Sequence, residues 1–308
     1  MQNKYIPLRR QREVGEIITA YFNFFKTNFK PFVNIFISYN GLFILGFLGL
    51  SYLLVTGFVG AYINTPTNGF STNTTKYELY LILGGLGFII LFIATTVLNY
   101  SLAAGYIIKY EQGKGDEIAK KMVWELIKDN LGKIILFVIL AIFMYLLIIT
   151  IGIIVSFIPV LGTIAYYIMI MAFTSWMGLS FMAMLNENLE VMDAFLEGFN
   201  LLKRYFWKCI LSNLVIGILL GILMMVVLMV PGIIIGIYAF HSLDTGVDLA
   251  NSSVANIVWT LALALLLVLY TVNQSMLQFV NGILYYSLHE ETYNEATRER
   301  IDNIGAGE

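Results

Sequence analysis

This sequence of 308 residues is short of charge: Asp, Glu, Lys and Arg make up only 12% of it. An average soluble domain is about 25% charged, so the composition excludes an ordinary soluble globular protein. The missing charge leaves segments with none of these four residues, at 31–75, 79–108, 134–186, 209–243 and 249–289. A membrane-spanning helix needs about 20 apolar residues. Each segment is therefore long enough for one span, and the longest is long enough for two.

Proline is also scarce, with five in the chain, which makes Pro159 in the middle of the longest segment informative. Proline breaks a helix, and the glycine at 162 permits the chain to reverse. We therefore predict a tight helical hairpin at this point. The sequence then predicts an all-α polytopic membrane protein with six spans at about 33–61, 79–108, 134–157, 163–185, 209–238 and 254–287.

Groups that could carry chemistry are few. The lone Cys209 excludes an intramolecular disulfide, and His241 and His289 lie at opposite ends of predicted spans. None of the six predicted spans contains an Asp, Glu, Lys, Arg or His residue. Catalysis needs a positioned acid, base, nucleophile or metal, so we expect no enzyme activity, no catalytic residue, no metal and no cofactor. Proton-coupled transport is also disfavoured, because it usually leaves ionisable groups at membrane depth.

The positive charge that is present lies almost entirely on one side of the predicted membrane. Of the 18 Lys and Arg residues, only Lys76 falls in a loop on the other side. Short loops rich in Lys and Arg stay in the cytoplasm. The sequence therefore predicts that both termini are cytoplasmic.

A short phrase occurs three times, each time just before an uncharged segment: FNFFKTNF at 22–29, WELIKDNL at 124–131 and FNLLKRYF at 199–206. The copies share an aromatic residue, then two apolar residues and a lysine. Such internal repeats indicate repeated structural units. We expect one membrane domain over 1–292, with repeats at about 12–110, 115–186 and 188–288, followed by an acidic cytoplasmic tail at 293–308. Each repeat would consist of an amphipathic helix and a transmembrane hairpin.

The amphipathic helices follow from the spacing of apolar residues in each copy. Such a helix can lie in the inner membrane interface, or it can pack on the ends of the bundle, and both readings stay open. We expect Lys26, Lys128 and Lys203 to reach lipid headgroups while their stems stay buried. The predicted stripes are Val14, Ile17, Ile18, Tyr21, Phe22, Phe25 and Phe29, then Ala119, Met122, Val123, Leu126 and Leu131, then Val191, Ala194, Phe195, Gly198, Phe199, Leu202 and Phe206.

Neutral polar residues are the remaining candidates for a site. Four of them share a face of span six, and others lie in spans two and five. They can form hydrogen bonds between helices, or they can line a polar cavity that opens to the cytoplasm. The candidates are Asn99, Asn213, Gln274, Gln278, Asn281 and Tyr285.

Two further expectations concern glycines and acids. The pairs Gly217 with Gly221 and Gly232 with Gly236 in span five have the spacing that allows close helix approach, and Gly84, Gly85 and Gly87 in span two are interpreted in the same way. The acids Glu187, Glu290 and Glu291 are interpreted as solvated groups at helix ends.

The triple pattern occurs together with Phe206-Trp207-Lys208 before span five, Pro231-Gly232 within it and Leu284-Tyr285-Tyr286-Ser287-Leu288 at the close of span six. In these features the chain resembles, over about 12–292, the membrane domain attached to some bacterial glycerophosphoryl diester phosphodiesterases and its stand-alone relatives. The resemblance implies a six-helix bundle. The fused members carry their chemistry on a separate soluble barrel, and we expect this chain to be a stand-alone relative without it.

These observations lead to three functional hypotheses. The first is a non-enzymatic integral protein of the bacterial inner (plasma) membrane that acts as a scaffold or accessory factor, with membrane lipids and other membrane or cytoplasmic proteins as partners and no nucleic acid. The alternative is a transporter or lipid-handling protein with a neutral polar cavity lined by span six. A third hypothesis is a regulatory membrane subunit for an enzyme made as a separate chain.

Overall fold

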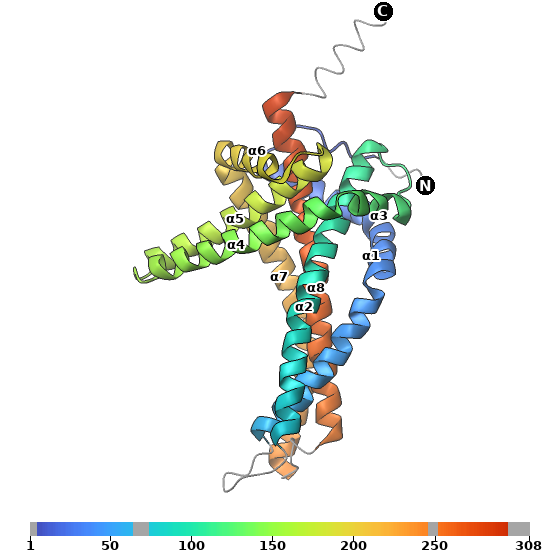
Figure 1. The fold of residues 1–308 in the computed structure, drawn as a ribbon, viewed down its shortest axis with the longest axis vertical. Coiled ribbons are helices and arrows are strands. Elements are labelled where there is room, and N and C mark those ends of the chain that lie inside the picture. Colours follow the sequence, from blue (N-terminus) through green and yellow to red (C-terminus); the bar gives the residue numbers. More distant parts are fainter. Residues whose placement is uncertain (1–4, 64–73, 246–251, 295–308) are drawn as a thin grey trace, which may run out of the picture. The chain divides into compact units, whose positions relative to one another are not determined.

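The computed structural model describes residues 5–63, 74–245 and 252–294, and these residues form helices and no strands (Figure 1). Six of the helices are long and apolar enough to cross a membrane, which confirms the all-α polytopic fold and the six predicted spans. Most of the predicted acidic tail at 293–308 lies outside the described residues. The helices are α1 (Val14–Phe58, followed by a π-helical turn, Val59–Ile63), α2 (Thr74–Gln112), α3 (Lys120–Asp129), α4 (Leu131–Ser156), α5 (Leu161–Asn186), α6 (Val191–Arg204), α7 (Phe206–Thr245) and α8 (Ser253–Tyr293).

The amphipathic phrases fold in two ways. In the second and third repeats they form the separate short helices α3 and α6, which are followed by Asn130 and Tyr205, both outside helical geometry. In the first repeat the helix runs without a break through the corresponding residue, Asn28, into the span, and it contains Pro31. Proline lacks the backbone N–H that would bond to the carbonyl of Thr27. Despite this missing bond, the first amphipathic segment and its span form one helix.

The chain divides into two compact units, and four of the helices contribute residues to both. Unit 1 comprises Met1–Ile35, Asn99–Leu219 and Ser275–Glu308, and unit 2 comprises Phe36–Leu98 and Leu220–Gln274. Unit 1 thus contains α3, α4, α5 and α6 together with parts of α1, α2, α7 and α8. Among its described residues, unit 2 contains the remaining parts of those last four helices and the π-helical turn.

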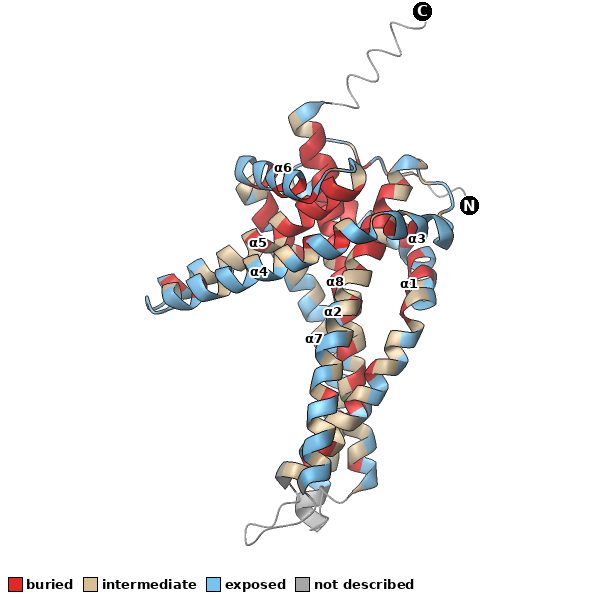
Figure 2. Cartoon of the chain, viewed as in Figure 1, coloured by how far each residue is buried: buried red, intermediate tan, exposed pale blue. Residues whose placement is uncertain are grey.

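Unit 1 has an aromatic core. Phe279 of α8 packs against Phe32 and Phe24 of α1, with ring centroids 4.6 and 5.4 Å apart, and against Tyr106 of α2 at 6.1 Å. All four side chains are almost completely buried. Figure 2 shows the buried residues of unit 1 gathered where α5, α6 and the unit-1 parts of α2 and α8 meet. Burial of large aromatic side chains on this scale supplies much of the packing energy of a core.

The α4–α5 hairpin has the tight reversal that was predicted at Pro159. The N–H of Leu161 donates to the carbonyl of Pro159 at 2.7 Å, and Val160 between them has φ 63° and ψ −62°. This is a γ-turn with a positive φ, a rare and strained conformation for a β-branched residue. A Cβ on Gly162 would overlap the carbonyl oxygen of Val155, so glycine at this position lets the two helices meet.

Unit 2 is held by apolar packing and a few polar pairs. The amide of Asn256 on α8 donates to the hydroxyl of Thr56 on α1 at 3.2 Å, and the rings of Phe92 and Tyr270 lie 5.2 Å apart. A Cβ on Gly84 or Gly87 of α2 would come within 2.9 or 2.6 Å of leucine side chains of α1. The predicted close approach at these two glycines is therefore confirmed.

The predicted close approach at the glycines of span five is wrong within the described residues. A Cβ built on Gly217, Gly221, Gly232 or Gly236 would meet no atom within 4 Å, and the same holds for Gly85 of span two. Most side chains along this part of α7 are exposed or only half-buried. A glycine permits a neighbouring helix to approach closely, but it does not bring one there. No described helix packs against these positions of α7.

Candidate functional site

Three amides of the predicted set meet inside unit 1, between α5, α7 and α8. The side-chain amide of Asn213 on α7 donates to the hydroxyl of Ser175 at 2.9 Å and to the side-chain oxygen of Asn281 at 3.1 Å. Asn281 donates to the side-chain oxygen of Gln278 at 3.4 Å. All of these side chains are buried. We call Ser175, Asn213, Gln278 and Asn281 the amide cluster.

Gly178 of α5 makes room for this cluster. A Cβ at that position would overlap the side chain of Asn281, and the carbonyl of Gly178 accepts a hydrogen bond from Gln278 at 3.5 Å. The carbonyl of Cys209 accepts another bond from Asn213 at 3.2 Å. The amides are therefore packed directly against one another, and the cluster joins three helices through uncharged hydrogen bonds.

The other predicted polar residues lie in different places. Gln274 belongs to unit 2, where its amide donates to the hydroxyl of Thr96 at 2.8 Å. Asn99 is buried in unit 1, and its carbonyl accepts a bond from Ser275 at 3.3 Å. Tyr285 lies beyond the amide cluster, in a group of charged residues. The single polar face read from span six is thus divided among three environments.

That group of charged residues lies at the ends of α5 and α8. Tyr285 donates a hydrogen bond to the carboxylate of Glu187, and Nε2 of His289 lies 3.1 Å from the same carboxylate oxygen. Tyr286 donates to the side-chain oxygen of Asn186 at 2.7 Å. Burial raises the pKa of Glu187, but the hydrogen bonds from His289 and Tyr285 lower it by more than burial raises it. The net pKa therefore lies below its usual value. Glu187 is therefore held ionised.

The expectation that the acids near these helix ends are solvated is wrong. Glu187 accepts the bonds just described, Glu290 is buried, and Glu291 pairs with Lys208 at 2.8 Å. Their partners are up to about 100 residues away in the chain. No local pattern in the sequence indicates such pairs, although Tyr285 and His289 are one helical turn apart and so share a face.

The N-terminal segment also docks on unit 1, a feature that sequence reasoning missed. The carboxylate of Glu111 at the end of α2 accepts bonds from the hydroxyl of Tyr5 at 2.9 Å and from the N–H of Leu8 at 3.1 Å. Leu8 is fully buried. Arg12 donates to the carbonyl of Leu8 at 2.7 Å, and Arg9 lies 5.6 Å over the ring of Tyr286. These arginines therefore contact protein groups.

The three repeated lysines share one environment. Lys26, Lys128 and Lys203 are all exposed, and within the ranges that the structure describes none of them makes a hydrogen bond or ion pair. The aromatic residue one helical turn before each lysine is also partly exposed: Phe22 is 46% exposed, Trp124 39% and Phe199 45%. We call these the three aromatic–lysine pairs.

The residues of the predicted amphipathic stripes are divided between a buried and an exposed side of each helix. In α1 the residues Ile17 and Tyr21 are buried in unit 1, whereas Phe22 and Phe29 are exposed. In α6 the buried face packs on α5, where Gly198 lets the helices touch at Ser180. In α3 the buried residues are Val123 and Ile127, of which the sequence stripe included only Val123. Each helix therefore packs on the protein with one apolar face and leaves a second one exposed.

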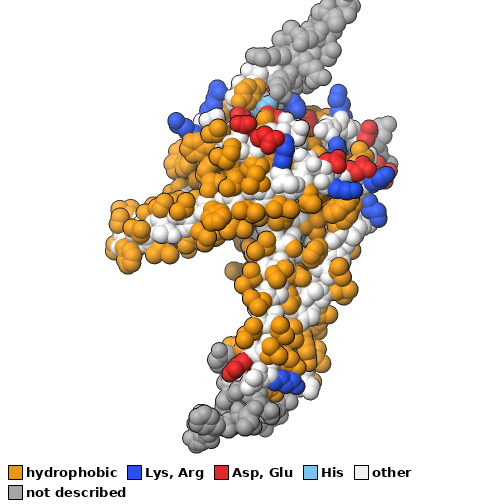
Figure 3. All heavy atoms as spheres, in the orientation of Figure 1, with side chains coloured by type: hydrophobic (Ala, Val, Ile, Leu, Met, Phe, Trp, Pro, Cys, Tyr) orange, Lys and Arg blue, Asp and Glu red, His pale blue; other side chains and the backbone are white. Residues whose placement is uncertain are grey.

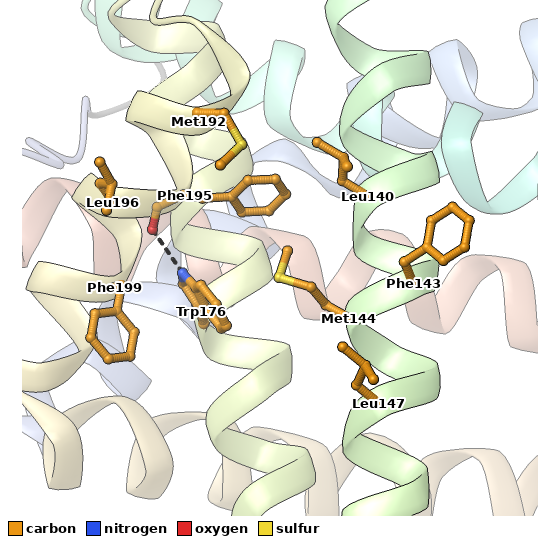
Figure 4. Close-up of a pocket in the computed structure, with 9 residues that line it drawn as sticks. All are labelled: Leu140, Phe143, Met144, Leu147, Trp176, Met192, Phe195, Leu196 and Phe199. Atoms are coloured by element: carbon orange, nitrogen blue, oxygen red, sulfur yellow. Dashed lines mark hydrogen bonds between the residues drawn. The ribbon is translucent and has the colours of Figure 1, made fainter.

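The exposed face of α6 borders an apolar groove with a volume of about 440 Å³ (Figure 4). The indole N–H of Trp176, one of the lining residues, donates to the carbonyl of Phe195 at 2.8 Å. A second hollow of about 360 Å³ shares Trp176 and Phe199 with the groove and also includes Lys203. The groove is lined by Leu140, Phe143, Met144, Leu147, Trp176, Met192, Phe195, Leu196 and Phe199.

Charged and hydrophobic side chains occupy different parts of unit 1. On the face drawn in Figure 3, the charged side chains gather over the part that holds α3 and α6, and hydrophobic side chains cover the α4–α5 hairpin. In the part of the chain that the structure describes, no three His, Cys, Asp or Glu side chains lie close enough to hold a metal ion. The arrangement can hold helices together and present apolar and cationic surfaces.

Comparisons with protein-family models, with characterised proteins and with solved structures find no match for this chain. The fold by itself defines the class, an all-helical polytopic membrane protein.

Proposed function

We propose that this protein is a non-enzymatic scaffold or accessory factor of the bacterial inner membrane, which holds partner proteins or lipids at the cytoplasmic interface. Its amphipathic segments, in α1, α3 and α6, provide the contact surface, and the spans anchor that surface in the bilayer. Both termini lie in the cytoplasm in this proposal, as the distribution of Lys and Arg indicates.

The three aromatic–lysine pairs carry the proposal. Trp and Phe on the apolar face of an amphipathic helix are typical of the membrane interface. A lysine one turn away can extend its stem along the apolar surface and place its charge among phosphates. In contrast, Lys133 and Lys208 pair with Glu190 at 3.0 Å and Glu291 at 2.8 Å. Lys30 and Lys114 also lack a side-chain partner among the described residues, so it is the exposed aromatic residue one turn earlier that sets the three repeat lysines apart. This combination favours an external ligand for them.

The alternative of a neutral polar transport path has less support. Asn213, Gln278 and Asn281 bond to one another and to α5, so a solute could pass only if these bonds opened. Hydrogen bonds of this kind commonly join membrane helices, at about 0.6 kcal/mol each. The resemblance to the membrane domain of glycerophosphoryl diester phosphodiesterases agrees with an accessory role, because that domain accompanies the catalytic barrel in fused proteins.

The proposal is tested by purifying the tagged chain in mild detergent from cells that naturally make it and quantifying the proteins that remain bound. The double variant Phe22→Ser, Trp124→Ser should insert normally but lose most of those proteins, because it removes two of the exposed aromatic side chains. The matched control is Asn23→Ser, Glu125→Ser, which changes the adjacent exposed positions and should keep them. Equal recovery from both variants would refute the scaffold role.

A further inference from the structure

We propose that the groove between α4, α5 and α6 binds one acyl chain of an anionic membrane phospholipid, whose headgroup pairs with Lys203. This proposal rests on the proposed membrane role of α6 and names a lipid partner for it. The groove and the neighbouring hollow lie entirely within unit 1.

An acyl chain fits the chemistry of the groove. Its lining consists only of Leu, Met, Phe and Trp side chains. The one polar side-chain group among them, the indole N–H of Trp176, already donates to the carbonyl of Phe195. The volume of about 440 Å³ lies within the range of small-molecule sites, about 300–1,000 Å³. A ligand here therefore needs apolar surface and no hydrogen-bonding group.

The helices that form the groove determine where such a ligand comes from. α4 and α5 are long and apolar enough to cross the membrane, so in the proposed membrane lipid chains would reach the exposed side of α4, which carries Phe143 and Leu147. α6 is amphipathic, with Asp193 and Lys203 on the same short helix as the exposed Met192 and Leu196. A membrane phospholipid reaches both parts of this surface without leaving the bilayer, whereas a soluble apolar ligand would have to displace lipid first.

Lys203 selects an anionic headgroup. It borders the hollow that continues from the groove past Trp176 and Phe199, and it has no hydrogen-bond or ion-pair partner among the described residues. The nearby Lys208, in contrast, is neutralised by Glu291 at 2.8 Å and Glu13 at 3.7 Å. A lipid phosphate without a compensating amine complements the unpaired lysine.

Trp176 offers a direct measurement, because bromine atoms on an acyl chain quench tryptophan fluorescence on contact. The full chain is prepared with Trp124→Phe, Trp207→Phe and Trp259→Phe, so that Trp176 is the only tryptophan, and is placed in lipid nanodiscs. Brominated phosphatidylglycerol or brominated phosphatidylcholine is then added in increasing fraction. We expect half-maximal quenching of Trp176 at about a fivefold lower fraction of phosphatidylglycerol, the effect of one lysine near an anionic lipid.

Lys203→Gln should remove this difference between the two lipids. Lys128→Gln is the matched control, since Lys128 has the same repeat position on α3 but does not border the groove. A chain that keeps only Trp207, which is 62% exposed, reports ordinary surrounding lipid. Equal quenching of Trp176 by both lipids, or a preference that survives Lys203→Gln, overturns the proposal. Neither outcome affects the recovery of partner proteins by the Phe22 and Trp124 variants, so the two proposals fail separately.

Discussion

At the scale of single residues, the amide cluster depends on one glycine. Gly178 brings α5 close enough to α8 for Asn281 to lie against its backbone, and the glycine carbonyl accepts a bond from Gln278 at 3.5 Å. Burying an unpaired amide costs free energy. The hydrogen bonds that offset this cost depend on the close approach of α5 and α8.

We predict that Gly178→Ala destabilises the protein by about 1–3 kcal/mol, because the added methyl group overlaps the side chain of Asn281. Gly217→Ala is the control, since its methyl group would meet nothing within 4 Å, and it should be neutral or stabilising by up to about 1 kcal/mol. Reversible unfolding in mixed detergent micelles measures both variants. Equal stabilities of the two would contradict the role of Gly178.

Glu187 predicts a dependence of stability on pH. Its hydrogen bonds with His289 and Tyr285 hold its pKa below the ordinary value of 4.5 despite the opposing effect of burial. Its contribution to stability is therefore complete above the pKa of the unfolded chain and is lost as the pH falls through the lower folded value. Thermal unfolding from pH 7 to pH 3 should show a fall below about pH 4.5 that Glu187→Gln reduces. If the stability of Glu187→Gln falls equally at low pH, the pH dependence comes from other groups.

At the scale of helices, the amphipathic segments and the hairpin show how local sequence is used twice. α6 packs Ala194 and Phe195 against the protein and leaves Met192, Leu196 and Phe199 exposed. The α4–α5 turn combines a helix-breaking proline with a residue in an unfavourable conformation, Val160. The exposed apolar face of α6 needs an apolar environment outside the protein. The α4–α5 turn holds Val160 in a strained backbone conformation.

The strained turn yields a prediction. Val160→Gly should stabilise the hairpin by up to about 1 kcal/mol, because relief of the positive φ, worth about 1–3 kcal/mol, outweighs the added freedom of glycine in the unfolded chain. Thr163→Gly, in the first turn of α5, should instead cost up to about 1 kcal/mol. Unfolding under the same micelle conditions compares them. If both variants lose stability equally, Val160 is not strained.

At the scale of the whole molecule, six spans and the charge sorting make a topological prediction. Labels at both termini should react only from the cytoplasmic side, and a label near residue 68, between α1 and α2, should react only from the opposite side. An even number of spans returns the chain to its starting side, and six spans would place 17 of the 18 Lys and Arg residues on that side. Termini that react from opposite sides would refute the six-span reading.

The sequence alone determined the class of protein, the six spans and the Pro159 reversal. These features depend on hydropathy, charge and backbone preference, which are properties of residues near one another in the chain. The sequence also identified Asn213, Gln278 and Asn281 as polar residues in apolar helices, but it could not say that they bond to one another.

Only the tertiary structure decided which neighbours these residues have. The bonds of Glu187 with His289 and Tyr285, the contact of Gly178 with Asn281 and the docking of Tyr5 on Glu111 join residues about 100 positions apart. The tertiary structure also decided the environment of the glycines of span five. Their spacing predicted a contact that no neighbouring helix makes within the described residues. Spacing along a helix establishes which residues share a face, but the packing of distant segments decides what that face meets.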